Sequence, residues 1–160
     1  MVQSEELGEL FSINYSALSA NIDGVTHAES LLSPHPGGNN LNWVVGHIVM
    51  SRGVILNLMT NEELLTPAEA RPYKRGSHSG NNNDLLSFDI LRTKLDQSEE
   101  RLHEALKQQT PETLEKTNKH KKKEQQPLGK QLLFLHFHEA YHVGQTGLLR
   151  RLVGKEGAIQ

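Results

Sequence analysis

The chain has 160 residues, a formal net charge of -2 and no cysteine, and these totals exclude several classes of protein. This length suits a single domain with its own core, so we expect residues 1–160 to form one domain with one site. Without cysteine there can be no disulfide, no thiolate metal site and no cysteine nucleophile. A slightly acidic chain has no general attraction for nucleic acid, and we expect no nucleic-acid partner.

The beginning of the chain, MVQSEELGELFSINYS, carries acids in place of the basic and apolar regions of a secretory signal. No run of about 18 apolar residues occurs, as a membrane-spanning helix would require. The basic run at 119–123 is followed by Glu124, and we interpret it as a solvated connection. We therefore expect a cytoplasmic protein with no membrane partner.

Apolar residues spaced three and four apart predict two helices in the first part of the chain. The first is predicted over 4–22, with an inward line made of Leu7, Leu10, Phe11, Asn14 and Leu18. Residues 33–40 are rich in Pro, Gly and Asn and predict a break. The second helix is predicted over 41–59, with one stripe made of Val44, His47, Ser51, Val54 and Leu58.

Residues 60–83 form the longest irregular stretch, in which Thr66 and Pro67 mark a short helical start. Such loops often cover a site, and His78 is the histidine of this stretch that we consider able to reach that site. A third helix is predicted over 84–109, with Phe88, Leu91, Leu95, Leu102 and Leu106 facing inward. A fourth is predicted over 128–153, before Gly154. The chain is therefore predicted to be an all-α four-helix bundle with a long connection between helices two and three.

Three polar residues interrupt the centre of the predicted inner seam of the last helix. That seam reads Leu128, Leu132, Leu135, His138, His142, Gln145, Leu149 and Leu152. His138 and His142 are four residues apart, so their rings stand about one turn apart and can share one ion. His47 interrupts the stripe of the second helix in the same way. Three imidazoles on one ion leave positions open for substrate, which is typical of catalytic sites, whereas the alternative is hydrogen-bonded core histidines.

Residues 138–142 also read H-E-x-x-H, the pattern of zinc proteases in which the Glu activates water. The longer protease motif fails, because Gln145 and Leu148 stand where Gly and a third His are needed. We favour a solvated or dimer-interface charge for Glu139 and simple packing for Tyr141. A catalytic role for either residue is the alternative.

The segments 42–47, NWVVGH, and 138–145, HEAYHVGQ, resemble the two signatures of the DinB/YfiT-like superfamily of proposed metalloenzymes. The stretch 72–76 also looks family-like. The resemblance implies a four-helix bundle in which His47, His138 and His142 hold a divalent ion. It implies nickel or zinc, with iron or manganese as alternatives, and a homodimer. It further implies a reaction of low-molecular-weight thiols, as in the characterised transferases and isomerases of the family.

Our leading hypothesis is therefore transfer or addition of a small thiol to an electrophilic small molecule, with the ion lowering the pKa of the thiol. In it, Gln145 hydrogen-bonds substrate or water, and Tyr141 or Glu139 orients a ligand or acts as a base. Arg150 and Arg151 are candidates for holding a carboxylate of the thiol, or else surface cations at a helix end. The alternative functions are hydrolysis by a metal-bound water and a non-catalytic metal-binding bundle.

Overall fold

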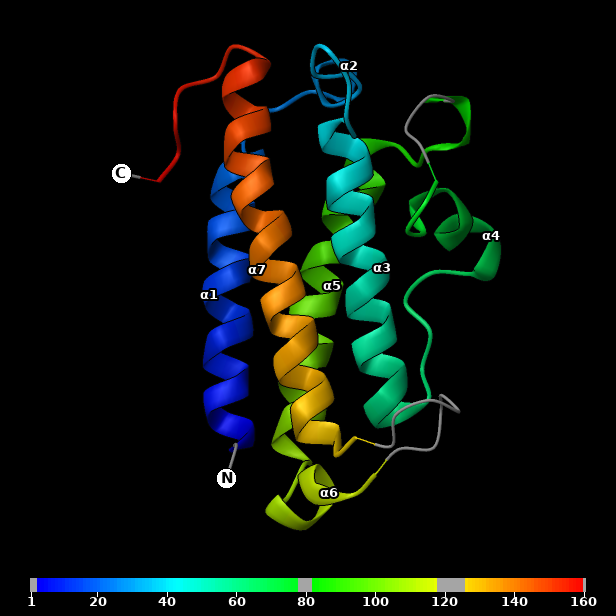
Figure 1. Ribbon diagram of the computed structural model, residues 1–160, viewed down its shortest axis with the longest axis vertical. Helices are drawn as coiled ribbons and strands as arrows, with labels where there is room; N and C mark the ends of the chain where they lie inside the picture. The colour runs from blue at the N-terminus through cyan, green and yellow to red at the C-terminus, as the bar shows by residue number, and fades with distance from the viewer. Residues whose placement is uncertain (1–2, 78–81, 118–125, 160) are drawn as a thin grey trace.

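The computed structural model describes residues 3–77, 82–117 and 126–159, and it confirms the predicted all-α fold (Figure 1). Within these ranges the regular structure is helical, apart from an isolated β-bridge between Thr117 and Pro127. The long helices are α1 (Ser4–Ile22), α3 (Leu41–Thr60), α5 (Phe88–Lys107) and α7 (Leu128–Leu152). His78 and the basic run at 119–123, both interpreted from the sequence, lie outside the described residues.

The boundaries of the long helices agree with the predicted ones to within one residue, except for those of α5. This helix begins at Phe88 and not at 84, because the Ser87 side chain caps it by accepting a hydrogen bond from the N–H of Ile90. It ends at Lys107 and not at 109, because Thr110 caps a further short helix. Both differences therefore come from capping residues that the apolar spacing does not register.

Five short elements join the long helices: α2 (His27–Ser30), α4 (Pro67–Ala70), η1 (Arg71–Tyr73), η2 (Asn82–Asp84) and α6 (Pro111–Glu115). Each of the three short α-helices follows a threonine whose side chain accepts the N–H of the residue three positions on. The sequence predicted the start of α4 at Pro67. It did not predict α2 or α6, which are too short for an apolar period to appear.

Each long helix packs against two others: α1 against α5 and α7, and α3 against the same two. In the view of Figure 1, α1 and α7 run upward, while α3 and α5 run downward. The connection from α3 to α5 must therefore return along the length of the bundle, and its described part from 61 to 77 does so over the outside of α3. This return places the predicted covering loop on the flank of the helix that carries His47.

The buried face of α7 is rotated from the predicted one. Glu139, Val143 and Thr146 are buried, whereas Leu152 is 57% exposed and the ring-bearing pair His138 and His142 is only half-buried. The predicted inner seam of this helix was therefore right for Leu128, Leu132 and Leu149 but wrong for Leu152. The stripe on α3 was right for Val44, His47 and Ser51, which are buried, but wrong for Val54, which is 47% exposed. Spacing fixes the angle between residues on a helix, about 100° per residue, but not the rotation of the helix about its own axis.

Helix α3 is long and apolar enough to cross a membrane, with a mean hydropathy of 1.3. However, 61% of that segment is buried inside the bundle. Its side chains include Arg52, which is fully buried and ion-paired with Glu99 and Glu139. These features are those of a helix in the core of the bundle.

Candidate metal centre

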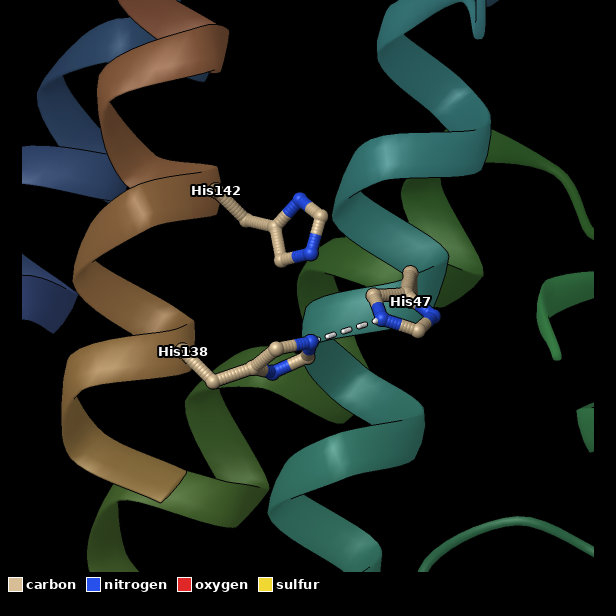
Figure 2. A group of neighbouring side chains, drawn as sticks. All are labelled: His47, His138 and His142. Atoms are coloured by element: carbon tan, nitrogen blue, oxygen red, sulfur yellow. Dashed lines mark hydrogen bonds between the residues drawn. The ribbon is translucent and has the colours of Figure 1, made fainter. Parts of the chain in front are cut away.

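Three histidine rings converge between α3 and α7 (Figure 2). One atom of each of His47, His138 and His142 lies within 4.8 Å of the corresponding atoms of the other two. The Nε2 atoms of His47 and His138 are 3.3 Å apart. Two nitrogens bound tetrahedrally at about 2.0–2.1 Å from one zinc ion would be separated by about 3.3 Å. The spacing is therefore that of two ligands of a single ion, with the third ring beside them.

The orientation of His47 is fixed by the loop that covers α3. Its Nδ1 lies 2.6 Å from the backbone oxygen of Tyr73, and because a carbonyl only accepts, Nδ1 must carry the proton. The neutral ring then has its lone pair on Nε2, which faces His138. Trp43 stacks on the other side of the ring, with centroids 4.9 Å apart and planes 8° from parallel. His47 is thus held as a pre-oriented Nε2 ligand.

The loop reaches His47 because the segment 42–47 is shaped to receive it. A Cβ on Gly46 would lie 2.1 Å from the Tyr73 ring, so only glycine leaves room for that ring. The Tyr73 hydroxyl accepts from the N–H of Leu86 at 2.7 Å and donates to Asn42 Oδ1 at 3.3 Å. Trp43 Nε1 donates to the backbone oxygen of Pro72 at 3.0 Å. Residues of the motif other than the histidine therefore position the loop.

The two histidines of α7 differ in their support. His142 Nδ1 lies 2.7 Å from Gln145 Oε1, an acceptor, so this ring also presents Nε2 as its lone pair. His138 Nδ1 is buried and has no hydrogen-bond partner among the described residues, while its Nε2 faces His47. Gln145, expected to contact substrate or water, accepts a hydrogen bond from His142 in this structure.

Burial makes all three rings weak bases. It lowers the pKa of His47, against the opposing hydrogen bond to Tyr73. It lowers the pKa of His142 to about 4, and it lowers that of His138 with further help from the charges of His47 and Arg75. At neutral pH the rings are therefore uncharged, the form that binds a metal. Neutral imidazoles suit zinc, nickel, copper or iron, so the donor set fits a divalent ion.

Glu139 is not a solvated or dimer-interface charge, and that expectation was wrong. Its side chain is 1% exposed, and both of its oxygens accept hydrogen bonds from Arg52, at 2.8 and 2.9 Å. Arg52 also contacts Glu99 at 2.9 Å, and although burial opposes its charge, the two carboxylates raise its pKa. The literal H-E-x-x-H match therefore holds two histidines beside a buried ion pair, and the glutamate points into the core.

The other expected site residues lie at different distances from the three rings. Tyr141 is 60% exposed, and its ring stands edge-on to that of His142 with centroids 5.2 Å apart. Arg150 donates to the backbone oxygens of residues 21, 23 and 156, and it lies about 12 Å along α7 from His142. Arg151 is exposed at the same helix end, next to Gly157. The structure therefore does not bring Arg150 or Arg151 to the histidines.

Sequence reasoning missed two features of this site. Tyr73 supplies the carbonyl that orients His47, and Arg75 is the positive charge outside the cluster that acts on His138. Both lie in the stretch 72–76, which already looked family-like. That likeness was a signal in the sequence that pointed to the stretch that contains them.

Three histidines converging from the second and last long helices of a helical bundle define a class of bundle proteins with a candidate metal site. The family model of the DinB superfamily matches residues 10–146, and the chain belongs to that superfamily. Its fold is similar to a solved structure titled the conserved protein of locus from Enterococcus faecalis, with a TM-score of 0.74 and 15% sequence identity. That similarity covers 96% of this chain and 98% of the other. None of the curated proteins compared with the chain matches it.

Proposed function

We propose that this protein is a divalent-metal-dependent enzyme that transfers or adds a low-molecular-weight thiol to an electrophilic small molecule. The observation that carries the proposal is the convergence of three neutral imidazoles, two of them with Nε2 atoms 3.3 Å apart. An ion held by neutral ligands keeps its full charge and lowers the pKa of a thiol that binds to it. The chain has no cysteine, so the thiol would come from a second small molecule.

Nickel or zinc is the proposed ion. Imidazole nitrogen suits both metals, whereas manganese prefers carboxylate and water. The cluster contains three histidines and no carboxylate, and the neighbouring Glu139 is bound by Arg52. The donor set therefore supports nickel or zinc, with iron as a further choice and manganese as the least suited.

Two residues of α7 are proposed to assist. Gln145 would act by holding His142, since its oxygen accepts from the ring nitrogen on the side away from His47. Tyr141 is exposed beside His142 and would orient the substrate. Hydrolysis with Glu139 as base has less support, because both carboxylate oxygens are taken by Arg52. A purely structural metal has less support as well, because His138 and His142 are only half-buried.

We also propose that two copies of the chain associate through α7 in the cytoplasm. Three large apolar side chains of this helix, Phe134, Phe137 and Leu148, are 63–65% exposed, and Tyr141 lies among them. Their spacing of three, four and seven puts them on one face, and a contiguous apolar face favours association. Small molecules are the other proposed partners, with no role for nucleic acid or a membrane.

The first experiment is elemental analysis of the untagged protein, comparing wild type with His142→Ala and with His103→Ala. His103 is an exposed histidine of α5 and serves as the matched control. We expect near-stoichiometric metal in wild type and in His103→Ala, and a large loss in His142→Ala. No metal in any of the three proteins after incubation with nickel or zinc would refute the metal centre.

The second experiment tests the reaction. Metal-loaded protein is incubated with small thiols and small electrophiles, and thioether products are detected by mass spectrometry. We expect product formation that requires the metal and is lost in His142→Ala. Loaded protein that gives no product above background with any thiol would refute thiol transfer while leaving metal binding intact.

A further inference from the structure

We propose that Arg75 binds a carboxylate of the small molecules that the metal centre takes, so that the site as a whole selects anionic ligands. The inference rests on the proposed metal centre. It assigns the anion-binding role to a loop residue, whereas the sequence had suggested Arg150 and Arg151 at the end of α7.

The first argument is that the backbone around Arg75 is tied to the metal centre on both sides. Two residues before it, Tyr73 is fully buried and its oxygen lies 2.6 Å from His47 Nδ1. Two residues after it, Ser77 Oγ accepts from Trp43 Nε1 at 3.1 Å, and Trp43 stacks on the His47 ring. Arg75 is therefore presented by a short segment whose two ends are both fixed beside the same ligand.

The segment itself is a closed turn. The N–H of Ser77 donates to the oxygen of Lys74 at 3.0 Å, and Gly76 has a φ of 88°, a value that favours glycine. The Ser77 hydroxyl donates to the oxygen of Lys74 at 2.6 Å and closes the turn a second time. Arg75 is thus carried at the tip of a rigid turn.

The second argument is that Arg75 is a cation available at the metal centre. Its guanidinium is exposed and has no ion pair or hydrogen bond among the described residues. By contrast, Arg52 and Arg150 are each committed to several acceptors. Among the described residues, Arg75 is therefore an arginine in the segment held beside His47 and Trp43 whose donors are free for a ligand.

The third argument is the charge balance of the site. The three proposed ligands are neutral, so an ion would keep its charge of +2, and Arg75 would add to it. The nearest acid in sequence, Glu139, is already compensated by Arg52. A site with this excess of positive charge is completed by an anion. A guanidinium fork matches a carboxylate with two parallel hydrogen bonds, so a small molecule with both a metal-binding sulfur and a carboxylate would satisfy both groups.

The test uses cobalt-loaded protein and matched pairs of thiols that differ only in charge. The pairs are mercaptoacetate with 2-mercaptoethanol, and 3-mercaptopropionate with 3-mercapto-1-propanol. Their dissociation constants are measured from the visible absorption of the bound cobalt. Wild type is compared with Arg75→Gln, with Arg75→Lys, and with Lys74→Gln as the control that removes the neighbouring charge. Acetate is titrated separately into protein saturated with 2-mercaptoethanol. This titration tests whether Arg75 binds a carboxylate that belongs to a second molecule and not to the thiol.

We expect wild type and Lys74→Gln to bind at least one carboxylate thiol about five- to tenfold more tightly than its alcohol partner. Arg75→Gln should lose this preference while binding the alcohols as before, and Arg75→Lys should keep part of it. Acetate binding that depends on Arg75, in place of the thiol preference, would also support the proposal and would put the carboxylate on the electrophile.

Two outcomes separate the inference from the proposed function. The role of Arg75 would be refuted if cobalt-loaded Arg75→Gln showed the wild-type preference for carboxylate thiols and the wild-type affinity for acetate. The metal centre would not be affected by that result. Failure of the wild-type protein to bind cobalt, nickel or zinc would refute the metal centre itself, and the inference with it. Metal content of each variant is measured in parallel for this reason.

Discussion

Replacing Gly46 by alanine should separate the covering loop from the metal centre. The new Cβ would lie 2.1, 2.3 and 2.6 Å from three atoms of the Tyr73 ring, well inside any contact distance. Helix α3 is packed on its other side against α5 and α7, so the ring must move and not the helix. The Tyr73 oxygen would then leave His47 Nδ1, from which it is 2.6 Å away.

The size of the effect follows from what Tyr73 loses. Removing its buried ring from the bundle costs about 2–3 kcal/mol, and its two hydroxyl hydrogen bonds contribute about 1 kcal/mol each. Alanine gains about 1 kcal/mol over glycine in a helix interior. The free energy of unfolding should therefore fall by about 3–4 kcal/mol. Zinc affinity should fall about 10- to 100-fold, the usual effect of removing the partner of a ligand histidine.

The assay combines urea unfolding followed by circular dichroism with zinc competition against a chromophoric chelator. Gly144→Ala is the matched control, because a Cβ there meets no atom within 4 Å. It should keep wild-type zinc affinity and gain up to about 1 kcal/mol of stability. If Gly46→Ala matched this control in both measurements, the loop would not position His47 and the reasoning would be refuted.

Three further predictions concern the polar residues of the bundle. Glu139→Gln should lower the free energy of unfolding by about 3–5 kcal/mol in urea titrations, because it leaves the charge of Arg52 buried and only partly paired. Gln145→Leu should weaken zinc affinity about tenfold in chelator competition, with little change in stability, since His142 Nδ1 loses its acceptor. The metal-free protein should lose stability on acidification, because burial lowers the pKa of His142 from 6.5 to about 4. Below pH 6.5 the unfolded chain binds a proton that the native chain does not bind. After a discount for solvent screening of this half-buried ring, we expect a loss of roughly 1–2 kcal/mol by pH 4 in urea titrations.

Each of these predictions has a control on the same molecule. Glu104→Gln, an exposed change on α5, should leave stability within about 0.5 kcal/mol of wild type, and an equally small loss in Glu139→Gln would contradict the buried pair. Gln131→Leu makes the same change elsewhere on α7 and should leave zinc affinity unaltered. His142→Gln should lose the part of the acid sensitivity between pH 6.5 and 4 that His142 contributes, while His47 and His138, whose pKa burial also lowers, keep their share. An undiminished slope in that variant would mean that other groups carry it.

The sequence predicted the long helices and the shared face of His138 and His142 because both depend on local spacing. Apolar residues three and four apart locate a helix whatever it packs against, and two histidines four apart share a face in any helix. The start of α3 is also set by a local interaction, because the Asn40 side chain caps it by accepting a hydrogen bond from the N–H of Trp43. These parts of the structure could therefore be derived without knowing the tertiary contacts.

The rotation of α7 could not be derived in this way. Its core-facing line includes Glu139, and a carboxylate is assigned to the surface by any hydrophobic pattern. It is buried because Arg52, 87 residues earlier on α3, supplies two hydrogen bonds to it. Neither residue by itself predicts burial, so the sequence could not reveal the buried ion pair between Arg52 and Glu139. As a result, the prediction placed His138 and His142 deeper in the core than the structure does.

The role of Tyr73 could not be derived from the spacing of residues either. Tyr73 acts through its backbone oxygen, which any residue would have. Tyr73 can occupy this position because Gly46 has no side chain and leaves room for the Tyr73 ring. This fit depends on two segments that are 27 residues apart in the chain. A glycine inside an apolar helix is the available hint, because it lowers helix propensity and so favours an explanation by close packing.

The two polar links between α3 and α7 also bear on the order of folding. Arg52 and Glu139 are 87 residues apart, and His47 and His138 are 91 apart. Closing loops of this length costs conformational entropy that local contacts do not repay, so the docking of α7 belongs to the late stages of folding. Neither the ion pair nor the ligand set exists before that step. A chain still emerging from the ribosome would therefore have no metal site until its last helix is released, and metal acquisition would report on a completed bundle.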